Sequence, residues 1–328
     1  MNLKRVESKS DYENWNNFIS SNAEFATIAN NPSLVDILKR IYGWEGVNYF
    51  IQNDGNNIGS INLVEISNKL VSMPHFSYGG FTIANNQETN KREIFKELEN
   101  TLDRKIEIRD FIRLSEHANV DKITSYKSLI PDVDKQLMEL SSNQRRKVRK
   151  SYKNGLKIKI GKEYFDGFYD IYCSNMHDLG SPPLSKNFFN TILENYKYGN
   201  AEIFCSEYQG KIVGGGFLLG YQKFFENCWF STLGEYNNLY TSLFIYWEMI
   251  KYSIENEAEI FSFGRSTKNS PLHKFKSHWG TEDKQLYFNY SYDKNLNVKN
   301  FEILGKVWSK LPRSFVDKVG PYFAGKIY

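Results

Sequence analysis

The segment 261–280, FSFGRSTKNSPLHKFKSHWG, holds the residues of this chain that are best suited to chemistry. A short strand is expected to end at a glycine, and Arg265 follows that glycine at once. Ligands bind beyond the carboxyl ends of strands in open α/β sheets, so Arg265 is placed to meet a phosphate or a carboxylate. Lys276 stands close in sequence to Phe275 and Trp279, whose rings would remove water from its ammonium and strengthen its action on an oxyanion. The alternative is a surface loop with two tucked aromatic rings.

A second chemical feature is a basic run from Arg145 to Lys159 that contains no acidic residue. The whole chain carries 42 basic and 38 acidic residues, so it would be slightly acidic without this run. One local positive patch predicts an anionic partner such as a phosphate, a nucleic acid or an anionic lipid. A solvated helix face followed by a lysine-rich strand is the simpler alternative. The basic residues are Arg145, Arg146, Lys147, Arg149, Lys150, Lys153, Lys157 and Lys159.

Other kinds of site have little support in the sequence. None of the five histidines has a spacing typical of metal ligands, so we expect no metal. There is no G-x-S-x-G nucleophile motif, no G-x-G-x-x-G fingerprint and no Walker A motif. Three cysteines without a C-x-x-C pair, no signal-like N-terminus and no long apolar run lead us to expect a cytoplasmic protein.

Composition and patterning favour an α/β protein. Of the 328 residues, 41% are hydrophobic and 24% are charged, as in ordinary globular proteins. Alternating segments joined by glycine turns predict β-hairpins at 47–66 and 201–221, nearly half the chain apart, as two copies of one α/β unit would have. Chance similarity between hairpins is the alternative. We divide the chain into an N-terminal unit, 1–140, and a C-terminal unit, 141–328, with a basic helix at the junction and a helical tail. The glycine cluster 214–216 predicts a bulge or a close backbone approach within the second hairpin.

The second half of the chain, roughly 141–280, resembles the Fem family of aminoacyltransferases within the GNAT acyltransferase superfamily. The first half matches mainly through PHFSYGG (74–80), and the tail 310–323 resembles the ends of FemAB-like proteins. The order and spacing of the matching pieces carry the resemblance. These pieces are SSNQRRKVRKSYKNG (141–155), YCSNMHDLGSPPLSKNFF (172–189), the hairpin through Gly216, NNLYTSLFIYWEMI (237–250) and FGRS…FKSHWG (263–280).

The resemblance implies two tandem GNAT-like domains, each a mixed, mostly antiparallel sheet flanked by helices. It also implies transfer of an acyl or aminoacyl group to an amine. Phe275 and Lys276 match the F-K pair that lies at the acceptor end of an aminoacyl-tRNA donor in the family. Lys276 would then stabilise the developing oxyanion or the leaving ribose oxygen. Arg145, Arg146 and Arg149 would face the phosphates of a nucleotide-linked or lipid-linked acceptor.

The chain departs from the family in two places. The helical-hairpin arm of some Fem transferases has no counterpart here. STLGEYNNLY (231–240), with the single glycine Gly234, stands where GNAT proteins have a glycine-rich pyrophosphate loop. The second departure lowers the expectation of acetyl-CoA as donor, because backbone amides of such a loop hold the pyrophosphate. The donor is left open among an aminoacyl-tRNA, an acyl-CoA and an acyl carrier.

The remaining site residues are expectations from residue type and position. Glu235, His177 and Asp178 are candidates for the general base, and we take Glu235 forward with Lys276 as the catalytic pair. The many tyrosines could line a polar cleft or pack in the core. The residues expected to contact substrate are Arg265, Phe275, Trp279, Tyr78, Tyr240, Arg145, Arg146 and Arg149.

We therefore expect an N-acyltransferase that acts on an amine of a cell-envelope sugar or peptidoglycan precursor. A transferase that depends on aminoacyl-tRNA is the alternative enzyme, and a nucleic-acid-binding protein using the basic run 145–159 is the alternative without catalysis. The expected partners are a phosphate-bearing acceptor and a tRNA or acyl-carrier donor. Peripheral contact with the inner membrane face, through the basic run or through Trp308 and the tail 315–322, would suit a lipid-linked acceptor.

Overall fold

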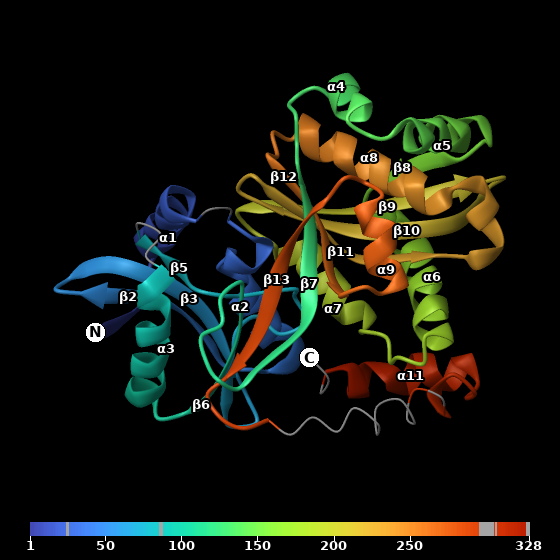
Figure 1. Cartoon of the computed structure of the whole chain (residues 1–328). Coiled ribbons are helices and arrows are strands. Elements are labelled where there is room, and N and C mark those ends of the chain that lie inside the picture. The colour runs from blue at the N-terminus through green and yellow to red at the C-terminus, as the bar shows by residue number, and fades with distance from the viewer. Residues whose placement is uncertain (24–25, 85–87, 295–304, 306, 326–328) are drawn as a thin grey trace.

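The chain folds around one continuous mixed sheet with helices on both faces (Figure 1). A computed structural model describes residues 1–23, 26–84, 88–294, 305 and 307–325. In this part of the chain the sheet has 13 strands in the order β1-β2-β3-β4-β6-β13-β7-β12-β11-β10-β9-β8, and β5 pairs with β3. All but two of the paired neighbours run antiparallel, as β4–β6 and β11–β12 alone are parallel among the described pairs. The α/β architecture with a mostly antiparallel sheet is confirmed.

The first half of the chain supplies one end of this sheet and the helices around it. Period-two alternation and the Asn53-to-Asn57 turn make β2 and β3 a hairpin. The elements are β1 (Asn2–Arg5), α1 (Lys9–Asn22), a 3-10 turn (Ile28–Asn30), α2 (Ser33–Tyr42), β2 (Gly46–Asn53), β3 (Asn56–Ile66), β4 (Lys69–Val71), β5 (Thr82–Ile83), α3 (Glu88–Leu102) and β6 (Lys105–Asp110).

The second half supplies the other end of the sheet. Its elements are β7 (Ala118–Ser128), α4 (Val133–Met138), α5 (Ser142–Lys153), β8 (Lys157–Ile160), the 3-10 turn η3 (Lys162–Tyr164), α6 (Phe165–Asp178), α7 (Lys186–Asn195), β9 (Gly199–Tyr208), β10 (Lys211–Tyr221), β11 (Phe224–Thr232), the 3-10 segment η4 (Gly234–Leu239), α8 (Thr241–Glu255), β12 (Ile260–Thr267), α9 (Pro271–Ser277), β13 (Glu282–Tyr290) and α11 (Arg313–Ala324).

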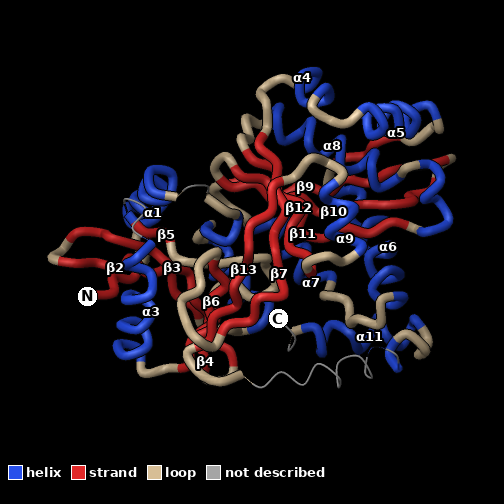
Figure 2. The backbone as a smooth tube through the Cα atoms, in the orientation of Figure 1, coloured by secondary structure: helices blue, strands red, loops and turns tan. Residues whose placement is uncertain are grey.

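Two long strands, β7 and β13, join the halves of the sheet. β13 pairs with β6 on one side and with β7 on the other, and β7 then pairs with β12. Figure 2 shows both strands running through the middle of the molecule, between the strands of the two ends of the sheet. Strands from distant parts of the sequence therefore alternate at the junction, which holds the two lobes in a fixed register.

Helices cover both faces of the C-terminal part of the sheet because β10 alternates its side chains. Phe217 and Leu219 belong to the core cluster under α6 and α7, whereas Val213 and Leu218 belong to the cluster under α8. A strand buried on both faces is expected to be apolar without interruption, and β10 is.

The glycine cluster 214–216 marks close approach and a bulge, as the sequence predicts. The register of β10 against β9 shifts between Ile212 and Gly214. A Cβ on Gly214 would lie 2.8 Å from the Thr232 methyl and 2.9 Å from the Thr241 methyl. Both neighbours are β-branched and have stiff χ1 angles, so they cannot easily move away.

We therefore expect Gly214→Ala to lower the free energy of unfolding by about 1–3 kcal/mol, the usual cost of overpacking. Urea denaturation measures this. Gly234→Ala is the matched control, since a Cβ there would meet no atom closer than 3.9 Å. Equal midpoints for both variants would contradict this account of the packing.

Candidate active site

The two parallel strands β11 and β12 pair over a short stretch and then part. Their ladder runs from Phe224 opposite Ile260 to Glu226 opposite Ser262. Beyond it, β11 continues to Thr232 paired with β10, and β12 continues to Thr267 paired with β7. Each strand has a register shift close to the end of the shared ladder. Such bulges bend a strand, and here they separate two backbone edges in the interior of the sheet.

Glu226 is the last residue of β11 that pairs with β12, and its carboxyl group is buried. Its side chain accepts hydrogen bonds from Ser77 Oγ (2.8 Å), Tyr78 OH (2.7 Å) and Ser262 Oγ (2.9 Å). Burial raises the pKa of Glu226, and the hydroxyl donors oppose that shift. Ser77 and Tyr78 come from the loop 74–80 of the first half, so this carboxyl group ties that loop to the strands that part.

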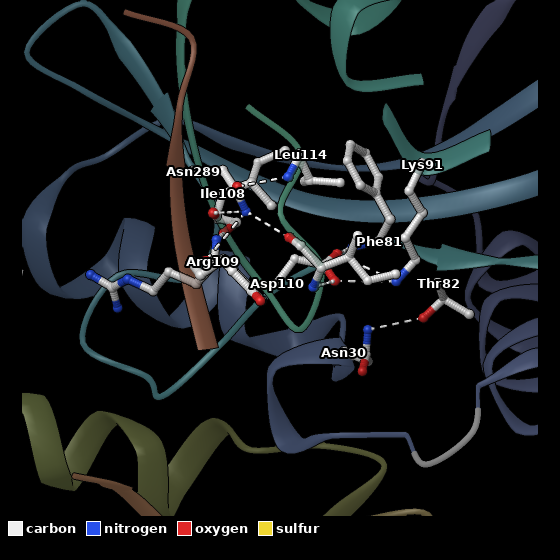
Figure 3. Close-up of polar contacts among 12 residues, drawn as sticks. Asn30, Phe81, Thr82, Lys91, Ile108, Arg109, Asp110, Leu114 and Asn289 are labelled. Carbon is white, nitrogen blue, oxygen red and sulfur yellow. Dashed lines mark hydrogen bonds and ion pairs between the residues drawn. The ribbon is translucent and has the colours of Figure 1, made fainter. Parts of the chain in front are cut away.

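Two arginines hold the same loop from the other side. The carbonyl oxygen of Phe76 accepts hydrogen bonds from Arg109 Nη1 (2.7 Å) and Arg265 Nη1 (3.3 Å). Both guanidinium groups also lie over the Phe288 ring, at 4.9 and 5.8 Å from its centroid. Figure 3 shows Arg109 leaving β6 in the direction opposite to Asp110, as neighbouring side chains of a strand do. The arrangement concentrates positive charge beside the loop 74–80.

Lys276 lies at the point where β12 leaves β11. Its Nζ donates hydrogen bonds to the carbonyl oxygens of Gly264 (2.8 Å) and Arg265 (2.9 Å), and the residue is 2% exposed. Burial lowers the pKa of Lys276 to about 7, with a further lowering by Arg265, while Glu226 and Asp283 oppose the shift. Near neutral pH, both the ammonium and the amine forms are therefore populated.

Aromatic rings surround the helix that carries Lys276. Tyr246 of α8 packs against Phe275 (5.7 Å between centroids) and Trp279 (5.9 Å). Trp279 is fully buried and also contacts Phe263 of β12. α9 starts with Ser270 as N-cap and proline at the first helical position, which sets the direction of this short helix. The expected proximity of Lys276 to aromatic rings is present. The expectation that the strand ends at Gly264 is wrong, because β12 continues to Thr267 and Arg265 lies within it, opposite Thr124 of β7.

The basic helix α5 lies against α8 instead of beside Lys276. Lys150 Nζ lies 5.6 Å from the centroid of the Tyr240 ring, and Asn154 Nδ2 donates to the Leu239 carbonyl oxygen (3.3 Å). Arg146 and Arg149 are exposed on this helix. α5 therefore borders the segment that leads into the first turn of α8, which Tyr240 caps in a left-handed conformation.

Other expected site residues have contacts of their own. Arg145 donates to the carbonyl oxygens of Met138 and Leu140. These carbonyl groups lie at and just after the C-terminal end of α4, where the helix itself offers them no donor. Glu235 is exposed and forms an ion pair with Lys211 at 3.3 Å.

The other two candidate bases also lie apart from the Glu226 carboxyl group. His177 Nε2 is 2.8 Å from the carbonyl oxygen of Leu311, and Asp178 is largely exposed. The structure thus brings together Arg265, Tyr78, Lys276 and the rings, and it places the candidate bases elsewhere.

Sequence reasoning missed Glu226 and Arg109, and only Glu226 had a signal. Glu226 is a single acidic residue in the apolar strand sequence FFENCWF, whereas Arg109 takes the same polar phase of KIEIRDFI as Lys105 and Glu107. A charged residue in a strand buried on both sides is seldom found without a dedicated partner.

Three further structural findings bear on the kind of site. Among the described residues, no group of three or more His, Cys, Asp or Glu side chains could hold a metal ion. No helix in the described ranges is both long and apolar enough to cross a membrane. A cavity of about 680 Å³ lined by Lys69, Lys105 and Tyr292, among others, lies away from every residue expected for the site.

Residues 141–277 match the family model described as an acetyltransferase (GNAT) domain. This part of the chain is therefore similar to GNAT domains. It contains β11, β12 and Lys276, so the parting strands lie inside the matched region. No curated protein matches the chain.

Solved structures match the whole chain in fold. FemX aligns with a TM-score of 0.63 and 14% identity over 93% of this chain and 100% of that chain. The C-terminal domain of a proposed lysylphosphatidylglycerol synthetase from Agrobacterium fabrum aligns with a TM-score of 0.54 and 10% identity, over 92% and 97%. A tandem GNAT protein from the clavulanic acid pathway gives 0.54 and 9%, over 90% and 100%. The tandem GNAT fold that the resemblance implies is confirmed.

The lowered pKa of Lys276 predicts a pH-dependent stability. Between pH 7 and 10.5 the unfolded lysine keeps a proton that the folded one has released, so stability rises with pH across this window. Lys276→Met removes the amine whose proton release causes this rise of stability with pH. The stability advantage of the variant over the wild type should shrink by up to about 1.4 kcal/mol per pH unit as the pH rises from 7.

Urea unfolding at pH 7, 8 and 9 measures this difference. Lys274→Met is the control on the same helix, because Lys274 is exposed. Parallel pH profiles for wild type and Lys276→Met would show that Lys276 keeps an ordinary pKa.

Proposed function

We propose that the protein is an N-acyltransferase that transfers an acyl or aminoacyl group to an amine of a phosphate-bearing cell-envelope precursor, either a sugar or a peptidoglycan peptide. The observation that carries the proposal is the position of Lys276, whose Nζ lies on the Gly264 and Arg265 carbonyl oxygens at the parting of β11 and β12. This position lies within the GNAT domain.

The reaction needs few side chains. The acceptor nitrogen forms a bond to the donor carbonyl carbon, and a tetrahedral oxyanion results. The ester or thioester bond then breaks, and the leaving oxygen or sulfur takes up the equivalent of the proton that the amine loses. Orientation of both substrates and stabilisation of the oxyanion supply most of the rate enhancement in such a reaction.

Lys276 suits two steps of this sequence. As an ammonium in a site without bulk water, it stabilises the negative oxygen strongly. With a pKa of about 7, it can also pass a proton to the leaving group and recover it from the amine. Glu226 would act as a positioning residue, since its carboxyl group holds the loop 74–80 and favours the charged form of Lys276.

The donor is proposed to bind where α5 meets α8. A helix N-terminus and a basic helix together favour phosphate groups. Exposed arginines at this position support a polyanionic donor, of which aminoacyl-tRNA is the extreme case and an acyl-CoA the smaller one. This placement favours donor phosphates over acceptor phosphates as the ligands of Arg146 and Arg149.

We expect Lys276→Ala to lower kcat by at least about 100-fold while the thermal unfolding curve stays cooperative, because a charge used in the transition state is lost. The assay combines radiolabelled aminoacyl-tRNA, acetyl-CoA or an acyl carrier as donor with nucleotide-linked and lipid-linked peptidoglycan precursors as acceptors. Lys274→Ala on the same helix should keep full activity. Unchanged turnover by Lys276→Ala would remove Lys276 from the mechanism.

The double variant Arg146→Ala, Arg149→Ala should raise the KM for the donor about ten-fold or more and leave the KM for the acceptor unchanged. Steady-state kinetics with each substrate varied in turn measures this. Ribonuclease treatment then separates the donors, because only a tRNA-borne amino acid would be lost. A rise confined to the acceptor KM would assign these arginines to the acceptor instead.

A further inference from the structure

The C-terminal helix α11 turns aromatic side chains outward. The exposed rings are Phe315 (51%), Tyr322 (67%) and Phe323 (46%). Their spacings of seven and eight residues place them on one side of the helix. The side of α11 that packs against the protein carries Val316, Gly320 and Ala324, which are buried. Figure 1 shows α11 at the edge of the molecule, on the side away from α4. An exposed aromatic patch of this kind marks an interaction surface.

The segment before α11 extends this patch. The Trp308 ring contacts Phe323 at 5.8 Å between centroids, and Val307 is 55% exposed. We define the α11 face as Val307, Trp308, Phe315, Tyr322 and Phe323.

The charges on α11 and on the segment before it are divided by sign, and Asp166 and Asp170 of the neighbouring α6 line the same groove as Lys318. Lys310 and Lys318 are exposed, and Lys318 lies on the helix between Phe315 and Tyr322. The acidic residue of the helix, Asp317, is only half-exposed and forms an ion pair with Arg313 at 3.3 Å, and Arg313 in turn bonds to Asp170 of α6. The α11 face therefore presents aromatic rings and lysines outward while its described acid is engaged near α6. Anionic lipid headgroups complement this pattern, because aromatic rings settle at the membrane interface and lysines attract the headgroups.

A continuous path of contacts links α11 to the candidate active site. A Cβ on Gly320 would lie 2.5 Å from Pro183, and one on Gly325 would lie 2.9 Å from the Tyr42 ring, so this end of the chain packs against both lobes. Tyr42 stacks on His75 at 5.3 Å between centroids. His75 belongs to the loop 74–80, whose next residues hold the Glu226 carboxyl group. A surface bound to α11 would thus lie near the loop that borders the reaction centre.

We propose that the α11 face docks on an anionic phospholipid bilayer and that the acceptor is lipid-linked. The part about the acceptor rests on the proposed function, whereas docking itself does not. Docking would bring a headgroup-borne amine to the side of the molecule where α11 meets Tyr42 and the loop 74–80.

Co-sedimentation of the full chain with vesicles tests the docking. The probes are vesicles of phosphatidylcholine alone and of phosphatidylcholine with phosphatidylglycerol. The protein should bind the phosphatidylglycerol vesicles, and Phe315→Ser, Tyr322→Ser, Phe323→Ser combined should lower the partition coefficient about ten-fold or more. Lys310→Glu with Lys318→Glu should weaken binding to the anionic vesicles only. Met138→Ser is the matched control, since Met138 is 60% exposed on α4.

Absence of binding to either vesicle, or equal binding by the triple serine variant, would overturn the proposal. Sedimentation velocity without lipid provides a second readout, because a dimer that the triple variant abolishes would assign the α11 face to a second copy of the chain. Transfer to a nucleotide-linked acceptor without vesicle binding would overturn docking and keep the proposed function. Vesicle binding without transfer to any acceptor would support docking and overturn the proposed function.

Discussion

A carboxyl group that is removed from water must be given hydrogen-bond donors, and Glu226 receives its donors from both halves of the chain. The hydroxyl groups of Ser77 and Tyr78 reach it from the first half, and that of Ser262 reaches it from the neighbouring strand. Tyr78 and Ser262 share the Oε2 atom, whereas Ser77 donates to Oε1, so loss of the Ser77 hydroxyl would leave a buried oxygen without this donor, which costs more than a surface hydrogen bond. The position of the loop 74–80 therefore depends on this carboxyl group.

The shared sheet makes this arrangement rigid. Arg109 stands opposite Phe288 on β13, and Arg265 stands opposite Thr124 on β7, so both arginines lie on strands of one sheet. The strands that carry them, β6 and β12, are separated by β13 and β7 in the sheet. Their guanidinium groups nevertheless both donate to the Phe76 carbonyl oxygen. A site built on paired strands holds its charges in place before a substrate binds, which is what electrostatic catalysis requires.

Local patterns predicted most of the strands and helices, because alternation, helical spacing and glycine turns depend only on residues that are close in sequence. Helix α2 escaped prediction because Pro32 stands at its N-cap, and its first backbone N–H donates to the Asn31 side chain, which precedes the cap. The site was predicted only in part. Lys276, the aromatic rings beside it and Arg265 are close in sequence. Ser77 and Glu226 are 149 residues apart, and a contact at that separation cannot be predicted from the periodicity of neighbouring residues.

The most direct test of the central claim is a crystal structure of the protein with a non-hydrolysable donor analogue. The proposed reaction centre predicts the donor carbonyl oxygen within hydrogen-bond distance of Lys276 Nζ, at the point where β11 and β12 separate. A donor carbonyl bound on another face of the sheet, with Lys276 still enclosed by its two backbone carbonyl groups, would contradict the assignment.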